Sequence, residues 1–150
     1  MRFTVKKVLS AAVLVAVTGG ALAFSGASAV AQQDGTSRIN DSFETVTTDR
    51  GGVVVFEDYG PGAPGGGGND DYVQIGDEGD DGYGVRAYAW VNGNYKGVKY
   101  FGKGYLEYTI WDPFGNVKAG QRVKIKVCLA RWSGAPNENC GSKTRTITDG

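Results

Sequence analysis

The chain has 150 residues, with 16 basic and 16 acidic side chains, 25 glycines, two cysteines and no histidine. Without histidine, zinc sites of the usual type and hydrolytic triads with a histidine base are excluded. The balanced charge lacks the global positive field of a nucleic-acid-binding domain. We therefore expect no cofactor, no metal site and no nucleic-acid ligand.

Residues 1–31 have the organisation of a secretory signal peptide. A basic start (Arg2, Lys6, Lys7) is followed by a short apolar segment (8–17) and by small residues at Ala27, Ala29 and Ala31. The apolar segment is shorter than the roughly 20 residues that a transmembrane helix needs. Cleavage is expected after Ala31, with Ala29 as the close alternative. The sequence thus predicts a secreted, extracellular protein that has no membrane attachment after cleavage.

Residues 32–50 are predicted to form a polar N-terminal arm, although "FETVT" within it is also compatible with an edge strand. After cleavage the chain keeps 13 basic and 16 acidic residues, and these are unevenly placed. Residues 51–85 hold eight acids and no base, whereas residues 86–126 hold eight bases. The remaining segment, 51–150, is long enough for one domain of modest core.

Short runs of β-branched and aromatic residues alternate in this domain with Gly, Asn and Asp turns, and no segment has helical periodicity. Strands are expected near 53–59, 72–77, 85–91, 95–101, 105–111, 122–130 and 142–148. "NGN" at 92–94 predicts a tight hairpin, and "SGAPNEN" at 133–139 a longer hairpin loop. The pattern is typical of an all-β protein with a single immunoglobulin-like antiparallel β-sandwich of seven to eight strands.

The clearest strand is "RVKIKVCLA", 122–130, because its side chains alternate over eight residues. Val123, Ile125, Val127 and Leu129 are expected on the core side and Cys128 on the outer side. In an oxidising compartment, Cys128 and Cys140 are expected to form a disulfide. Closing so short a loop contributes roughly 2 to 3 kcal/mol in the chain-entropy model.

For two strands the alternation of side chains alone does not decide which side faces the core. In 85–91 either the set Val85, Ala87, Ala89, Val91 or the set Arg86, Tyr88, Trp90 could face the core. In 105–111 alternation places Tyr105 and Trp111 together, and we expect this pair to be exposed. Exposed aromatic side chains would suit the stacking of sugar rings.

The segment "GPGAPGGGGNDDY", 60–72, contains the letters of a dinucleotide-binding loop and of a calcium nonapeptide. A dinucleotide loop must open a helix, and here a strand follows. A calcium nonapeptide needs stacked repeats, and the chain has one copy. We therefore expect a loop that binds neither nucleotide nor calcium. An irregular calcium site from nearby carboxylates is kept as an alternative; its residues would be Asp70, Asp71, Asp77, Glu78, Asp80 and Asp81.

The segments "DEGDDGYGVRAYAW", "VKIKVCLA" and "ENCGSKTRTITDG", together with the signal peptide, resemble short secreted proteins of streptomycete-type (actinobacterial) bacteria that have no assigned activity. The resemblance implies an extracellular β-sandwich with a C-terminal disulfide hairpin. It implies no catalytic residues.

The functional expectation is a non-catalytic extracellular binding or interaction module acting at the cell envelope. Five cations are predicted to share one sheet face that holds an anionic envelope polymer or a secreted protein; they are Arg122, Lys124, Lys126, Lys143 and Arg145. One alternative is a secreted effector, such as a protease inhibitor or antimicrobial protein, with Trp132 as the anchor of its disulfide-closed loop. A second is a calcium-assisted carbohydrate-binding module.

Overall fold

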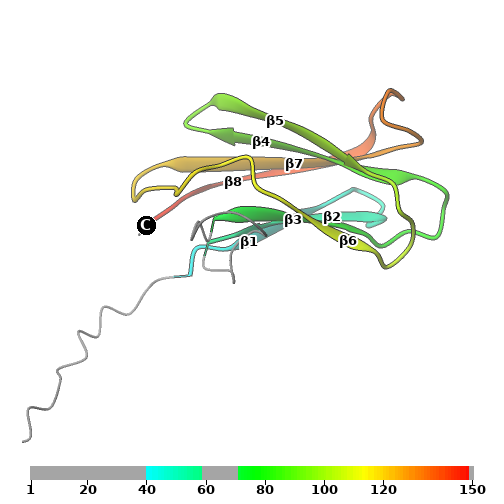
Figure 1. The fold of residues 1–150 in the computed structure, drawn as a ribbon, viewed down its shortest axis with the longest axis horizontal. Helices are drawn as coiled ribbons and strands as arrows, with labels where there is room; N and C mark the ends of the chain where they lie inside the picture. Colours follow the sequence, from blue (N-terminus) through cyan, green and yellow to red (C-terminus); the bar gives the residue numbers. More distant parts are fainter. Residues whose placement is uncertain (1–39, 59–70, 149–150) are drawn as a thin grey trace, which may run out of the picture. The chain divides into compact units, whose positions relative to one another are not determined.

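The computed structural model describes residues 40–58 and 71–148, all of which belong to one compact unit, Thr36–Gly150. These residues contain no helix. They form eight strands, which are arranged as two four-stranded antiparallel sheets (Figure 1). The predicted antiparallel β-sandwich of seven to eight strands is confirmed. The predicted signal peptide and the glycine-rich segment 60–68 lie outside the described residues.

The first sheet has the order β1-β2-β3-β6. Its strands are β1 (Phe43–Val46), β2 (Gly52–Glu57), β3 (Tyr72–Asp77) and β6 (Tyr108–Trp111). Valine, isoleucine and phenylalanine favour these extended segments, and alternate side chains point to opposite sides of the sheet. The core side of β2 and β3 carries Val54, Phe56, Val73 and Ile75, all completely buried. β1 lies within the segment that was expected to be a polar arm.

The second sheet has the order β5-β4-β7-β8. Its strands are β4 (Gly84–Val91), β5 (Asn94–Phe101), β7 (Arg122–Ala130) and β8 (Glu138–Thr146). Asn92 and Gly93 connect β4 to β5 with φ angles of 51° and 82°, as in a type I′ turn. The tight hairpin predicted from "NGN" is therefore confirmed.

The core between the sheets takes one alternate set of side chains from each inner strand. Val123, Ile125, Val127 and Leu129 of β7 are buried, as predicted. In β4 the buried set is Val85, Ala87, Ala89 and Val91. This leaves Arg86, Tyr88 and Trp90 on the outer side of the sheet, which settles the alternative that the sequence left open.

Trp111 was expected to be exposed beside Tyr105, and this expectation is wrong. Leu106 has a φ of 60°, and β6 begins only at Tyr108. The alternation therefore does not run from Tyr105 to Trp111. Tyr105 is exposed, whereas Trp111 lies opposite the core residue Val73 and packs against the core.

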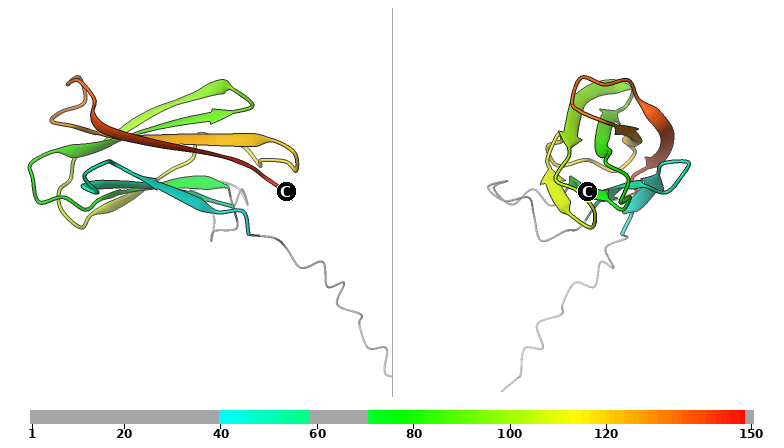
Figure 2. Two further views of the ribbon diagram at one scale, coloured as in Figure 1. Left: turned by 180° about the vertical axis from the view of Figure 1, so that it is seen from behind. Right: turned by 90° about the vertical axis from the view of Figure 1, so that its right-hand side faces the viewer.

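The edge strands β1 and β8 bring the two sheets together along one side of the sandwich (Figure 2). At Gly141 of β8 a Cβ atom would overlap the carbonyl oxygen of Val46 in β1, so only glycine fits this approach. The buried carboxylate of Asp41 accepts hydrogen bonds from the amide and hydroxyl of Thr148, both at 2.6 Å. These contacts join the start of the described domain to its last strand and to the residues that follow it.

Candidate functional site

The outer side of the β5-β4-β7-β8 sheet, called the outer face below, combines three kinds of side chain. Cross-strand neighbours of an antiparallel sheet point to the same side. The outer face accordingly carries Tyr95, Val98 and Tyr100 of β5, Arg86, Tyr88 and Trp90 of β4, Arg122, Lys124 and Lys126 of β7, and Ser142, Thr144 and Thr146 of β8. Its side chains are thus mainly aromatic toward β5, positively charged along β7 and hydroxyl-bearing along β8.

The prediction that five cations share this face is wrong for two of them. Lys143 and Arg145 lie opposite the core residues Ile125 and Val123, so their side chains leave β8 on the other side. Arg145 extends toward β1, where its Nη1 donates to the carbonyl of Ser42 at 3.1 Å. Its Nε also lies 3.7 Å from the carboxylate of Asp41. Arg122, Lys124 and Lys126 remain together on the outer face.

The register builds rows across three strands. Trp90, Lys124 and Thr144 form one row, and Tyr88, Lys126 and Ser142 form the next. The Nζ of Lys124 lies 4.9 Å from the ring centre of Trp90, and the Nζ of Lys126 lies 5.5 Å from that of Tyr88. Such cation–π contacts hold an ammonium beside a ring. They also offset the repulsion between neighbouring lysines.

A third row lies at the hairpin end of the sheet. The backbone amide of Arg122 donates to Oδ1 of Asn92 at 2.8 Å, and the amide of Asn92 donates to the carbonyl of Arg122. Thr146 lies opposite Arg122 on β8. The type I′ turn places Asn92 at this position, so Asn92, Arg122 and Thr146 continue the pattern with an amide in place of the ring.

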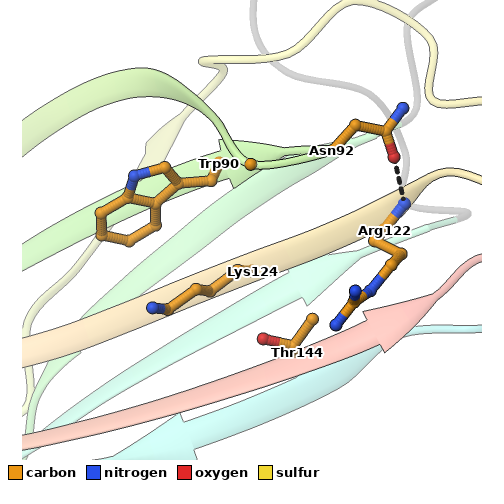
Figure 3. A pocket seen from close by; sticks show the side chains of 6 residues that line it. Trp90, Asn92, Arg122, Lys124 and Thr144 are labelled. Atoms are coloured by element: carbon orange, nitrogen blue, oxygen red, sulfur yellow. Dashed lines mark hydrogen bonds between the residues drawn. The ribbon is translucent and has the colours of Figure 1, made fainter.

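An open hollow of about 480 Å³ joins the first and third rows (Figure 3). It is lined by Trp90, Asn92, Gly93, Arg122, Lys124 and Thr144. Its size falls within the range of ligand sites. The lining offers a ring, two cations, an amide and a hydroxyl, which suits an anionic ligand with several acceptor oxygens.

At the opposite end of the sheet, the 131–137 loop covers the outer face. The guanidinium of Arg86 donates to the carbonyl oxygens of Trp132, Ser133 and Ala135 at 2.7 to 3.0 Å, and to Oδ1 of Asn137 at 2.6 Å. Arg86 is consequently only 8% exposed, although its side chain points away from the core. A second hollow, about 370 Å³, lies next to it and is lined by Arg86, Tyr88, Val98, Tyr100 and Ser133.

The predicted disulfide between Cys128 and Cys140 is present and closes the same loop. Cys128 lies opposite Arg86, on the outer side as expected, yet it is fully buried. Trp132, in contrast, is 60% exposed. The loop is thus fastened by one covalent bond, by four hydrogen bonds from Arg86 and by further hydrogen bonds with Tyr88 and Tyr100, while its tryptophan side chain faces solvent.

Acidic and basic residues are distributed unequally between the strands of the two sheets. The strands of the β5-β4-β7-β8 sheet contain one cation on β4, two on β5, three on β7 and two on β8, against the single acid Glu138. The strands of the other sheet contain three acids, Glu44, Glu57 and Asp77, and no base. The uneven charge along the sequence therefore becomes a difference between the two layers of the fold.

The carboxylates considered for calcium do not gather in the described part of the chain. Asp71 precedes β3 and accepts a hydrogen bond from the amide of Val117 at 2.6 Å, whereas Asp77 ends the same strand. Glu78 bonds the hydroxyl of Tyr108, and Asp81 bonds the amide of Tyr83. Among residues 40–58 and 71–148, no group of three or more His, Cys, Asp or Glu side chains is placed to hold a metal ion. Asp70 lies outside these residues.

The burial of the Asp77 carboxyl group is unfavourable to its charged form. This predicts that the stability of the fold depends on pH, which can be tested. It is 1% exposed, and its Oδ2 has no hydrogen-bond partner within the described structure. Burial, with the nearby charge of Asp81, raises the pKa of Asp77 above its ordinary value of 3.8, although the amide of Gly79 opposes the shift. The folded protein therefore holds this proton more tightly than the unfolded chain does. The associated stability is present at low pH and lost as pH rises through the folded-state pKa.

We expect Asp77→Asn to raise the free energy of unfolding at neutral pH, because a neutral amide does not carry the buried charge. Urea unfolding of the variant and the wild type between pH 4 and 8 measures this difference. Asp80→Asn, an exposed change in the same turn, serves as the control. A variant whose stability follows the wild type in parallel across this range would show that the Asp77 charge is not costly.

Tyr88, Trp90 and Tyr95 belong to the candidate site, and the sequence did not single them out for it. The ring centres of Tyr88 and Trp90 lie 6.1 Å apart, with the rings nearly parallel, and the ring centre of Tyr95 lies 5.5 Å from that of Trp90. Their signal was the alternation in "VRAYAWV", which indicated one face for Tyr88 and Trp90 without telling which side was outside.

No helix in the described residues is long and apolar enough to cross a membrane. Comparisons with models of protein families, with curated proteins and with solved structures find no match to this chain, so the outer face and the loop are interpreted from their own chemistry.

Proposed function

We propose that this chain is a secreted, non-catalytic binding protein whose outer face attaches it to an anionic polymer of the cell envelope. The main support is the set of three consecutive outward cations, Arg122, Lys124 and Lys126, each next to a neutral donor from β8. Complementary charge favours both encounter and orientation of such partners. The disulfide is compatible with an extracellular location, and the resemblance to secreted streptomycete-type proteins favours the same setting.

The proposal predicts that the protein sediments with purified cell wall of a streptomycete-type bacterium at low salt. Binding should weaken steeply with salt, because the Debye length falls from about 10 Å at 0.1 M to about 3 Å at 1 M. The double variant Lys124→Glu, Lys126→Glu should remain in the supernatant at low salt. Quantitative sedimentation, with folding checked by circular dichroism, measures both effects.

Matched variants separate this face from total charge. Lys103→Glu, Lys118→Glu makes the same charge change at exposed positions outside the strands and should still sediment. Lys143→Glu should have a smaller effect than Lys124→Glu, because Lys143 leaves β8 on the other side. If all variants sediment alike, or the wild type does not bind the wall, the proposal is wrong.

A second candidate, a secreted effector such as a protease inhibitor, is favoured by the exposed Trp132 on its fastened loop. Main-chain groups provide much of the affinity when a partner binds an extended segment. In this loop the carbonyl groups of Trp132, Ser133 and Ala135 already accept hydrogen bonds from Arg86. A target protein would therefore bind this loop through the exposed side chain of Trp132 rather than through these carbonyl groups.

A further inference from the structure

We infer that the polymer bound at the outer face is a polyol phosphate, a chain of phosphodiesters with three carbons between successive phosphates. The inference rests on the proposed function and specifies its ligand. The phosphates would lie along β7, with one phosphate at each of the three rows of the outer face.

The rows repeat at a fixed interval. Their cations, Arg122, Lys124 and Lys126, are two residues apart on one strand, and the hydroxyls Thr146, Thr144 and Ser142 face them on β8. Two residues of an antiparallel strand advance about 6.8 Å. A linear polymer that places one negative charge at each row must therefore repeat its charge at nearly this distance.

Backbone geometry gives the matching repeat. A peptide residue contributes three backbone bonds and spans at most about 3.3 to 3.6 Å, so six bonds of an extended chain span about 7 Å. Successive phosphorus atoms joined through two ester oxygens and three carbons are separated by six bonds. Such a phosphodiester is therefore in register with the rows, whereas a five-carbon polyol, with eight bonds, is not.

Each row has the donors that one phosphodiester needs. A phosphodiester carries one negative charge and accepts hydrogen bonds from lysine, arginine, serine and threonine side chains. The rows supply one cation and one exposed hydroxyl each. The hollow at Trp90, Arg122, Lys124 and Thr144 leaves room for the linking carbons between two rows.

A nucleic acid has the same six bonds between successive phosphates, so the rings, and not the repeat, favour a polyol phosphate over a nucleic acid. Trp90 and Tyr88 contact Lys124 and Lys126 and lie beside each other, and both rings are half-buried. Each ring already has an ammonium group beside it, which leaves less of the ring face for a base or a sugar. Beyond Lys126 the next outward position on β4 is Arg86, which the 131–137 loop engages, so the pattern ends after three rows.

Synthetic 1,3-linked glycerol phosphate oligomers of one to six phosphates test the inference, with binding measured by calorimetry on the full mature protein. Affinity should rise with each phosphate up to three and then change little. Log K of the trimer should fall as log salt rises, because binding neutralises three charges. Lys124→Gln should reduce this slope by about one third, since it removes one of the three contacts, whereas Lys103→Gln should not change it. Thr144→Val should weaken binding roughly five-fold at an unchanged slope.

Comparison ligands decide between polymers of equal charge. Ribitol phosphate trimers and galacturonate trimers should bind at least ten-fold more weakly than the glycerol phosphate trimer. Equal or tighter binding of either would overturn the inference, as would tighter binding of an oligothymidylate, which would identify a single-stranded nucleic acid as the ligand. If the wall binds through Lys124 and Lys126 while glycerol phosphate trimers do not, the inference fails and the proposed function stands. Absence of wall binding as well would remove both.

Discussion

Arg86→Ala is expected to lower the free energy of unfolding by roughly 3 kcal/mol, because hydrogen bonds to buried charged groups are strong and their loss is costly. The side chain fastens three carbonyl groups and Asn137 of the 131–137 loop to the outer face. Without it, the carbonyl groups of Ser133 and Ala135 lose this donor to water, while that of Trp132 keeps the amide of Ala135 and Asn137 keeps the hydroxyl of Tyr88. Chemical denaturation measures the stability, and hydrogen exchange at residues 131–137 measures the local loss of order.

Two further variants make this result specific. Arg131→Ala removes an arginine of the same loop whose guanidinium lies 4.4 Å from the ring centre of Tyr83, and it should cost less than about 1 kcal/mol. Arg86→Lys should recover little, because an ammonium lacks the planar fork that reaches several acceptors. If Arg86→Ala unfolds at the same denaturant concentration as the wild type, the disulfide and the hydrogen bonds of Tyr88 and Tyr100 are enough to hold the loop.

Gly141→Ala is expected to destabilise the fold by about 2 to 3 kcal/mol, as overpacking of a rigid contact does. The added methyl group would overlap the carbonyl oxygen of Val46, and backbone cannot move aside as a flexible side chain can. The edges of β1 and β8 must then separate. Thermal unfolding measures the loss, and exchange of the Thr48 amide, which donates to the carbonyl of Asn139 at 3.0 Å, reports the separation.

Gly134→Ala is the matched control, because its added Cβ would come no nearer than 3.6 Å to the Trp132 ring. This variant should unfold close to the wild type. A Gly141→Ala protein as stable as Gly134→Ala would mean that β1 and β8 do not approach as closely as the structure shows.

The strands were predictable where one alternating set was apolar and the other charged. β7 has this property, and its bounds agree with the prediction, Arg122 to Ala130. β4 does not, because both of its sets contain apolar side chains, so its outer side depended on packing with β7 and β5. The order in which strands pair was also not predictable, because it depends on contacts between segments distant in sequence.

The error over Lys143 and Arg145 could have been avoided from the sequence. If two cysteines face each other across a hairpin, residues whose numbers add to the same total are opposite. Cys128 and Cys140 are both even, so the even-numbered cations of β7 face the even-numbered threonines and serine of β8. The observed pairs Lys124↔Thr144 and Lys126↔Ser142 follow this rule, although the register shifts at Cys128 itself.

The other misses came from local backbone geometry. The left-handed φ at Leu106 interrupts the segment 105–111, and no residue type there announces it. The role of Arg86 was hidden for a different reason. Its four acceptors lie 46 to 51 residues further along the chain, so only the folded arrangement brings them together.

If many copies bind one polymer, as proposed, the edge strands determine whether these copies pair with one another. β1 and β6 have four residues each, β5 carries Lys96 and Lys99 beside an irregular register at Trp90, and β8 carries Lys143 and Arg145. Short edges and edge charges oppose pairing with the sheet of another copy. Copies crowded along one strand of polymer would therefore remain separate molecules, and dense coating of a surface need not lead to aggregation.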